Sequence, residues 1–104
     1  MKKKIEKVLR EFKIELKQLY GDNLVSVILY GSQARGDAKR FSDVDLMLIL
    51  NEKEDSKEDE LFELEFQHQM KDNVLLQTFT AKKDEFETWW HPLYINIRNE
   101  GIVL

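Results

Sequence analysis

Residues 30–50 carry the sequence YGSQARGDAKRFSDVDLMLIL, in which a glycine-rich turn separates two apolar runs. Gly31 has no Cβ, so it allows a sharp turn and a close approach of a ligand to the backbone. Asp43 and Asp45 open the second run, and on a strand their Cα atoms lie about 6.6 Å apart on one face. Two ionised carboxylates about 5 Å apart repel each other by about 3 kcal/mol at an effective dielectric constant of about 20. Placing the two aspartates side by side therefore costs free energy unless another group compensates their charge.

The same segment offers ligands for a cation and for a phosphate chain. A bound hard cation would turn the repulsion between the aspartates into attraction, and Mg²⁺ is the best match because it prefers oxygen ligands. Ser32 offers a hydroxyl and a backbone N–H at the turn, where successive N–H groups form an anion site. Arg35, Lys39 and Arg40 add positive charge beside it. The segment predicts a site for Mg²⁺ and a polyphosphate.

Short apolar runs predict three strands. Residues 24–30 and 42–50 are joined by too few residues for a full crossover helix, so we expect antiparallel neighbours. In the second run the even-numbered residues share one face, and the odd-numbered residues, including both aspartates, share the other. Residues 73–80 form the third strand, and the segment before it is long enough for a helix that makes this strand parallel to the second.

Apolar periodicity predicts two long helices. Residues 4–20 place their apolar side chains on one stripe, and Gly21 ends the helix. The second helix runs to about residue 71, and Ser56 followed by Asp59 resembles a capping box at its start. Its predicted apolar side comprises Leu61, Phe62, Leu64, Phe66 and Met70.

The C-terminal part predicts two shorter helices. One covers residues 84–90, and the other begins at Pro92 and ends at Gly101, after which the apolar residues 102–104 pack back onto the domain. Helices therefore alternate with strands, which is typical of an α/β protein with a small mixed sheet flanked by helices. We expect residues 1–104 to form a single domain.

The composition excludes several classes of protein. The 104 residues are 42% hydrophobic and 11% aromatic, which is enough for a core, and the chain has no cysteine for disulfides or thiolate metal sites. The net charge of −4 gives no overall attraction to long nucleic acids. No run approaches the ~20 apolar residues of a membrane span. The basic start of the chain leads into an amphipathic segment rather than a signal peptide, so we expect a soluble, cytoplasmic protein.

The motif G-S-x-x-R-G at residues 31–36, followed by S-D-x-D-L at residues 42–46, resembles the signature of the nucleotidyltransferase superfamily. That superfamily includes DNA polymerase beta, kanamycin nucleotidyltransferase and the poly(A)- and CCA-adding enzymes. The length resembles its smallest branch, the minimal nucleotidyltransferases of bacteria and archaea. The resemblance is strong over residues 24–50, and residues 94–101 are also similar to the C-termini of such proteins.

The resemblance implies the nucleotidyltransferase fold and a role for each matching residue. The expected nucleotide-binding residues are Gly31, Ser32, Arg35 and Arg40. Asp43 and Asp45 would be the catalytic carboxylates and the ligands of Mg²⁺. The reaction would transfer a nucleoside monophosphate from an NTP, expected to be ATP, to an acceptor hydroxyl and release pyrophosphate. Such catalysis consists mainly of positioning and charge neutralisation.

The minimal branch also implies a protein partner. Its members pair with a small, all-helical HEPN-type protein and act as the antitoxin of a toxin–antitoxin couple. Some of these antitoxins add AMP groups to the toxin, and others neutralise it by contact. A homo-oligomer is a further expectation for this chain.

One part of the family pattern is missing. The family places a third carboxylate on a later strand that faces the aspartate pair, but residues 74–80 contain no acid and have Gln77 at their centre. An amide cannot act as a general base. Asp72 before this strand, or Asp84 and Glu85 after it, would replace the acid only if the strand were shorter or shifted. Activity as an enzyme is therefore left open.

Three functions remain open on the sequence alone. The first is Mg²⁺-dependent nucleotidyl transfer, and the second is a binding module that keeps the nucleotide site and neutralises a helical partner by docking. The third is modification of a small molecule such as an aminoglycoside, for which the chain has no second domain to hold the acceptor.

Several residues also have structural interpretations. The aspartate pair alone is compatible with a solvent-exposed strand start. His68 and His91 have no metal-spaced histidine or cysteine partner, so we expect structural or surface roles. The dense aromatic residues are compatible with core packing or with a partner interface. They are Phe86, Trp89, Trp90 and Tyr94.

Overall fold

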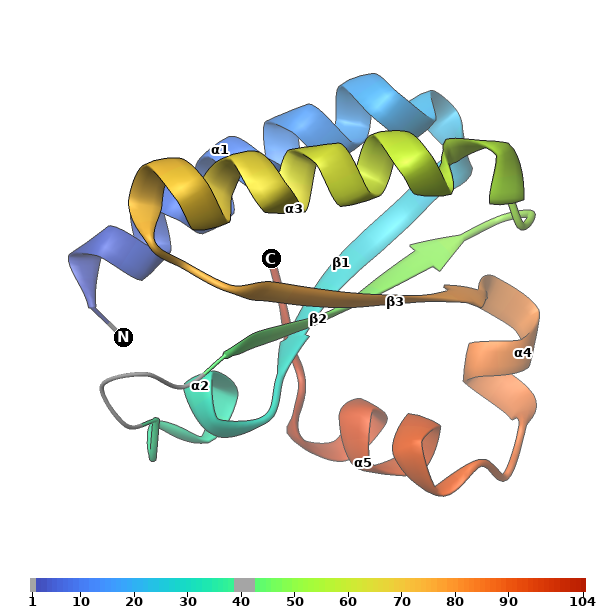
Figure 1. Ribbon diagram of the computed structural model, residues 1–104. Helices are drawn as coiled ribbons and strands as arrows, with labels where there is room; N and C mark the ends of the chain where they lie inside the picture. Colours follow the sequence, from blue (N-terminus) through green and yellow to red (C-terminus); the bar gives the residue numbers. More distant parts are fainter. Residues whose placement is uncertain (1, 39–42) are drawn as a thin grey trace.

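The computed structural model describes residues 2–38 and 43–104, which form a four-stranded mixed sheet with helices on both faces (Figure 1). The strands are β1 (Leu24–Tyr30), β2 (Val44–Leu50), β3 (Leu76–Lys82) and β4 (Ile102–Val103). The α-helices are α1 (Lys3–Tyr20), α2 (Ser32–Arg35), α3 (Glu58–Asp72), α4 (Lys83–Thr88) and α5 (Pro92–Glu100). Two 3₁₀ turns, Gly21–Asn23 and Asp55–Lys57, precede β1 and α3. The predicted α/β class is confirmed.

The strand order β3-β2-β1-β4 follows from the connections. β1 and β2 are antiparallel, with Tyr30 opposite Asp45, because the segment between them is too short for a crossover. β2 and β3 are parallel, and α3 forms the crossover between them. Residues 102–103 return to pair with β1, so the predicted packing of the tail is confirmed as strand pairing. Among the described residues, no helix is both long and apolar enough to cross a bilayer.

The sheet has one core on each face. α1 and α3 cover the first face (Figure 1), where Phe12, Leu16, Leu29 and Leu46 are at most 1% exposed. α4 and α5 cover the other face, where Met47, Phe86 and Ile97 are buried. The predicted alternation along β2 is confirmed, because its even-numbered residues enter the first core and Met47 and Ile49 enter the second. The aspartates at its start therefore lie on the α4–α5 side.

Four details of the prediction are wrong, and the first is that α4 ends at Thr88, two residues before the predicted end. β3 begins at Leu76, three residues later than expected, because Asn73 ends α3 with a positive φ of 56° and the chain then crosses to reach β2. α3 begins at Glu58 without a side-chain cap, so Ser56 forms no capping box. Leu61 is buried and Leu64 is packed against the core, but the rest of the predicted apolar side is exposed to solvent. These exposed residues are Phe62, Phe66 and Met70.

Candidate functional site

The turn between β1 and β2 is built around two glycines. Gly31 has φ 76° and ψ −155°, a conformation that is essentially restricted to glycine. It leads into α2, and Gly36, at φ 80°, ends that single turn. The N–H groups of Arg35 and Gly36 donate to the carbonyl oxygens of Gly31 and Ser32 at 3.1 and 3.0 Å. The first N–H groups of a helix have no acceptor within the helix itself, so those of α2 are candidates to face a ligand.

The carboxylate of Asp45 lies directly over this turn. Asp45 pairs with Tyr30 across β1 and β2, which brings it next to Gly31. A Cβ atom built on Gly31 would lie 2.5 Å from Oδ2 of Asp45, closer than the 3.0 Å below which real Cβ atoms essentially never approach another atom. The structure therefore brings the sharp turn and one of the two aspartates together, and only a glycine leaves room for both.

Asp43 and Gln77 complete this end of the sheet. Asp43 immediately precedes β2 and is half-buried, and its Oδ2 accepts a hydrogen bond of 2.8 Å from Nε2 of Gln77. Gln77 is also the neighbour of Asp45 in the parallel register of β2 and β3. Three polar side chains from two adjacent strands thus meet beside the glycine turn.

The environment raises the pKa of Asp45. Burial is the largest cause, the negative charge of Asp43 adds to it, and the positive charge of Arg35 partly opposes it. The pKa of the Tyr30 hydroxyl is also raised, first by burial and then by Asp45. Two neighbouring carboxylates are a suitable donor set for a hard cation, because the cation removes the repulsion between their charges. The residues present therefore fit Mg²⁺.

Arg35 provides a positive charge at the end of α2. Its Nε donates to Asp37 at 3.2 Å, and a terminal nitrogen donates to Glu100 of α5 at 3.4 Å. The guanidinium side chain is 48% exposed, so both carboxylates hold it loosely at the surface. Lys39 and Arg40, the other predicted basic residues, and Ser42 of the predicted motif lie outside the described residues.

Among the described residues, no acid takes the place of the missing third carboxylate on β3, which would face Asp43 and Asp45. Asp72 is bonded to Nδ1 of His68 at 3.0 Å, and Asp84 lies 4.0 Å from Lys82. Lys82 pairs with Leu50, five positions along the ladder from the Asp45–Gln77 pair and about 16 Å away. The register of β3 therefore leaves Gln77 facing the aspartates.

A second group of titratable residues joins α1 to α3. Ligand atoms of Glu11, His68 and Asp72 lie within 4.8 Å of one another. His68 is buried, however, and both ring nitrogens are already engaged, Nε2 with Glu15 at 2.5 Å and Nδ1 with Asp72. Burial alone would lower the pKa of His68, but the two carboxylates outweigh burial and raise it. The group therefore joins the two helices through ion pairs, and we call it the His68 clamp; a structural role is one of the two roles expected for His68.

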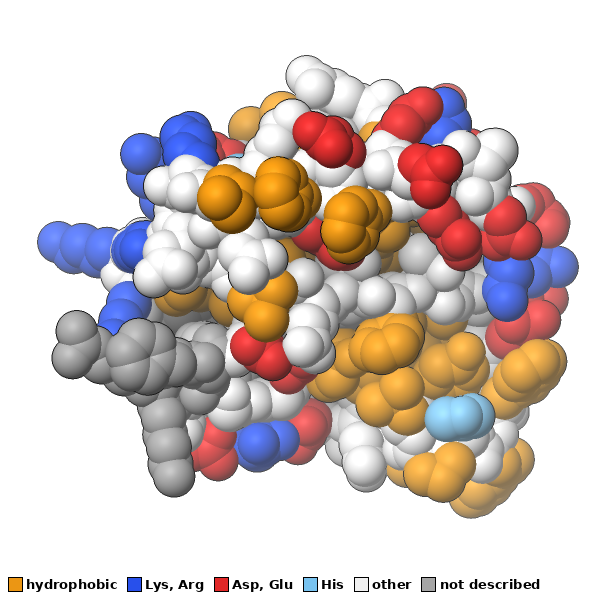
Figure 2. Space-filling view, in the orientation of Figure 1, with side chains coloured by type: hydrophobic (Ala, Val, Ile, Leu, Met, Phe, Trp, Pro, Cys, Tyr) orange, Lys and Arg blue, Asp and Glu red, His pale blue; other side chains and the backbone are white. Residues whose placement is uncertain are grey.

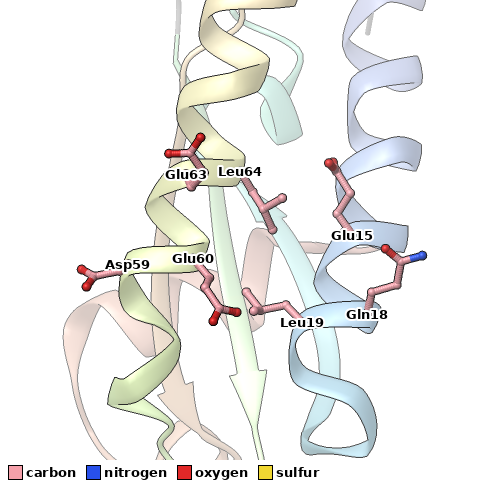
Figure 3. A pocket seen from close by; sticks show the side chains of 7 residues that line it. All are labelled: Glu15, Gln18, Leu19, Asp59, Glu60, Glu63 and Leu64. Carbon is pink, nitrogen blue, oxygen red and sulfur yellow. The ribbon is translucent and has the colours of Figure 1, made fainter.

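A groove of about 510 Å³ separates α1 from α3 at the other end of these helices. Leu19 and Leu64 point into it (Figure 3), and polar side chains surround them. Four of these are acidic and one is an amide; they are Glu15, Asp59, Glu60, Glu63 and Gln18. Negative charge on this scale repels phosphate, so the groove does not suit a nucleotide.

The aromatic residues near the C-terminus divide between the two expected roles. Phe86 is buried and packs against Tyr94 with ring centroids 5.5 Å apart, as core packing requires. Trp89 is 52% exposed and Trp90 is 90% exposed, so these two rings remain available to a partner. His91 caps α5, because its Nδ1 accepts from the N–H of Leu93 at 3.2 Å.

Comparison with known proteins agrees with this geometry. The family model of the nucleotidyltransferase domain matches residues 9–104. A protein of Methanocaldococcus jannaschii, named as a candidate protein adenylyltransferase, is 51% identical over 47 residues, which cover 45% of this chain and 32% of that protein. A second such protein of the same organism is 32% identical over 80 residues, which cover 76% of this chain and 81% of that protein. This chain thus spans about a third of the first relative and most of the second.

The fold also matches solved structures. One is a toxin–antitoxin crystallised with AMP-PNP, which has a TM-score of 0.61 and 19% identity. The match covers 96% of this chain and 68% of that chain. At this identity, the comparison establishes the shared fold.

Proposed function

The chain belongs to the nucleotidyltransferase domain family, and on this basis we propose that residues 1–104 form one nucleotidyltransferase domain that binds Mg²⁺ and ATP. The observation that carries the proposal is the Asp45 carboxylate lying over the glycine turn, with Asp43 beside it. Adenine is the favoured base because the curated relatives are named adenylyltransferases and the toxin–antitoxin neighbour was crystallised with AMP-PNP. ATP is supplied in the cytoplasm, where we expect the protein to act.

Each part of the site has a proposed task. Gly31 and Ser32 cradle the triphosphate with backbone N–H groups, and Arg35 contributes positive charge beside it. Asp43 and Asp45 hold Mg²⁺, which when bound supplies the charge neutralisation that phosphoryl chemistry needs. The reaction transfers AMP to an acceptor hydroxyl and releases pyrophosphate.

We propose a partner protein, a helical HEPN-type toxin, as the acceptor. The toxin–antitoxin neighbour and the protein adenylyltransferase relatives support a protein acceptor over a small molecule. The exposed rings of Trp89 and Trp90 are available as anchors for such a partner.

Gln77 favours a second candidate function, a module that binds nucleotide and partner with little turnover. Its amide bonds to Asp43 where the family has a third carboxylate, so no general base faces the aspartates from β3. In this form the protein neutralises its partner by docking.

A thermal-shift experiment tests the nucleotide site. Mg²⁺ with ATP at ten times Kd stabilises the folded state by about 1.4 kcal/mol, which raises Tm by roughly 6–11 °C for a domain of this size. Asp43→Asn with Asp45→Asn should abolish the rise without unfolding the protein, because the change removes a partly buried negative charge and the neighbouring carboxylate that repels it. Asp22→Asn, an exposed acid at the far end of β1, is the matched control and should keep the rise. No shift in the wild type contradicts the nucleotide site.

Mass analysis separates the two functions. The chain is incubated with ATP, Mg²⁺ and a co-encoded helical protein, and both chains are weighed. The mass of one AMP added to the partner selects the transferase, whereas a stable complex without added mass selects the binding module.

A further inference from the structure

One side of α3 presents an apolar stripe that is exposed to solvent. Phe62, Phe66 and Met70 follow one another at intervals of four residues and are 66%, 46% and 69% exposed. The two phenyl rings stack with centroids 6.5 Å apart. Figure 2 shows a row of hydrophobic side chains over α3 on the face where β3 forms the edge of the sheet. The stripe therefore lies beside the edge strand and away from the groove that α3 shares with α1.

The edge strand β3 is open along its outer side. The carbonyl of Leu75 accepts from the N–H of Val44, so backbone groups of odd-numbered residues point to β2 and those of residues 76, 78, 80 and 82 point outward. No strand within residues 2–38 and 43–104 pairs with that side. β3 contains no proline, and its central residue, Phe79, is 55% exposed. Such an unprotected edge is a template for pairing with another strand.

The middle of the apolar stripe on α3 and the middle of strand β3 lie at the same level along the two elements. Phe66 is the middle of the stripe and Phe79 is the middle of β3. A hydrogen bond from the Thr78 hydroxyl to Glu65 joins the residues next to these two, so both centres lie at the same level. A single two-fold axis can therefore pass near Phe66 and Phe79 together. Around such an axis the same surface is used twice, as in an isologous dimer.

We propose that two copies of this chain form a symmetric dimer through the β3 edge and the α3 stripe. The two β3 strands pair antiparallel and continue the sheet across the axis. Phe66 meets its own counterpart, and Phe62 meets Met70 of the second copy. This inference does not depend on nucleotide binding, because the aspartates lie at one end of β2.

The available area is sufficient for such a dimer. Phe62, Phe66, Met70 and Phe79 together expose on the order of 450 Å² of apolar side chain per copy, taking about 200 Å² for a complete large side chain. Two copies with their paired backbones therefore bury about 1,000 Å² or more, which is the lower limit for a specific protein interface. A lipid surface is disfavoured, because Glu58, Asp59, Glu60 and Glu63 accompany the stripe and anionic headgroups repel them.

Sedimentation velocity of the whole chain at about 100 μM tests the proposal. The sedimentation data should give the wild type a molar mass of twice the 12.4 kDa of one chain. Phe66→Glu should sediment as a monomer with an unchanged far-UV CD spectrum. Ile14→Glu, at a residue of α1 that is 59% exposed, is the matched control and should remain a dimer. A wild-type monomer, or a Phe66→Glu dimer, overturns the proposal.

Cysteine crosslinking gives a second test that does not depend on losing the dimer. The chain has no cysteine, so a single Phe66→Cys substitution on the two-fold axis should give a disulfide-linked pair under mild oxidation. Ile14→Cys should crosslink at least tenfold more slowly. Equal crosslinking rates for the two variants overturn the symmetric arrangement. A wild type that binds a different protein through Phe66 and forms no dimer also overturns it.

Discussion

Replacing Gly31 with alanine should damage the candidate site through two separable effects. Gly31 has φ 76° and ψ −155°, and an alanine in this region costs on the order of 1–3 kcal/mol of stability. The new Cβ would also lie 2.5 Å from Oδ2 of Asp45, whereas ordinary contacts begin at 3.4 Å. The carboxylate must therefore move by about 1 Å, and a displacement of this size in a reacting group typically costs ~10²-fold in rate.

The variant Gly21→Ala distinguishes the effect of backbone strain from the effect of moving the Asp45 carboxylate. Gly21 has φ 59° and ψ −136°, so alanine there meets similar backbone strain, but nothing lies within 4 Å of its Cβ position. Urea denaturation should show both variants destabilised by on the order of 1–3 kcal/mol. Thermal shift should show that Gly21→Ala keeps the rise in Tm with Mg²⁺ and ATP and that Gly31→Ala loses it.

A double-mutant cycle tests the contact without any ligand. Asp45→Ala removes the atom that the new Cβ would meet, so Gly31→Ala should cost less in that background, with a coupling free energy of at least about 0.5 kcal/mol. Zero coupling, together with a Gly31→Ala variant that keeps the full ligand-induced rise in Tm, would refute the reasoning.

Three further predictions concern the core, the clamp and the third position of the site. Leu46→Ala, at a fully buried side chain, should lower the free energy of unfolding by about 2–5 kcal/mol in urea denaturation, while Val25→Ala, 41% exposed, should cost under about 1 kcal/mol. The pKa of His68 is raised in the folded state, so its charged form adds stability that is complete below about pH 6.5 and is lost as the pH rises through the folded pKa. Urea denaturation between pH 6 and 9 should show this loss in the wild type and not in His68→Gln; equal slopes would contradict the clamp. Gln77→Glu should increase AMP transfer by the isolated chain by at least tenfold, measured by mass analysis, and no increase would show that more than this carboxylate is missing.

Local signals in the sequence predicted much of the fold. β1 has the predicted bounds because its apolar, β-branched run is bounded by turn residues on both sides. α5 begins at Pro92 and is followed by Gly101, since proline suits the first helical position and glycine often follows the last. The alternation predicted along β2 is also confirmed, because its even-numbered residues enter one core and Met47 and Ile49 enter the other.

Features that depend on distant partners could not be predicted in this way. The start of β3 is set by its pairing with β2, so Val74 and Leu75 look like strand residues but serve as the crossing from α3. The clamp on His68 joins it to Glu15, 53 positions earlier, and no short motif indicates such a pair. The sequence predicts a single apolar side for α3, but its apolar residues lie on more than one face, and the sequence alone does not show which face meets the core.

The hydrogen bond between Gln77 and Asp43 has a consequence for how such proteins diverge. Glutamine and glutamate codons differ in a single base, and the two side chains have nearly the same shape. One nucleotide change would therefore exchange an amide for an acid here without disturbing the sheet. Related proteins could therefore change between binding a nucleotide and reacting with it without any change in the fold.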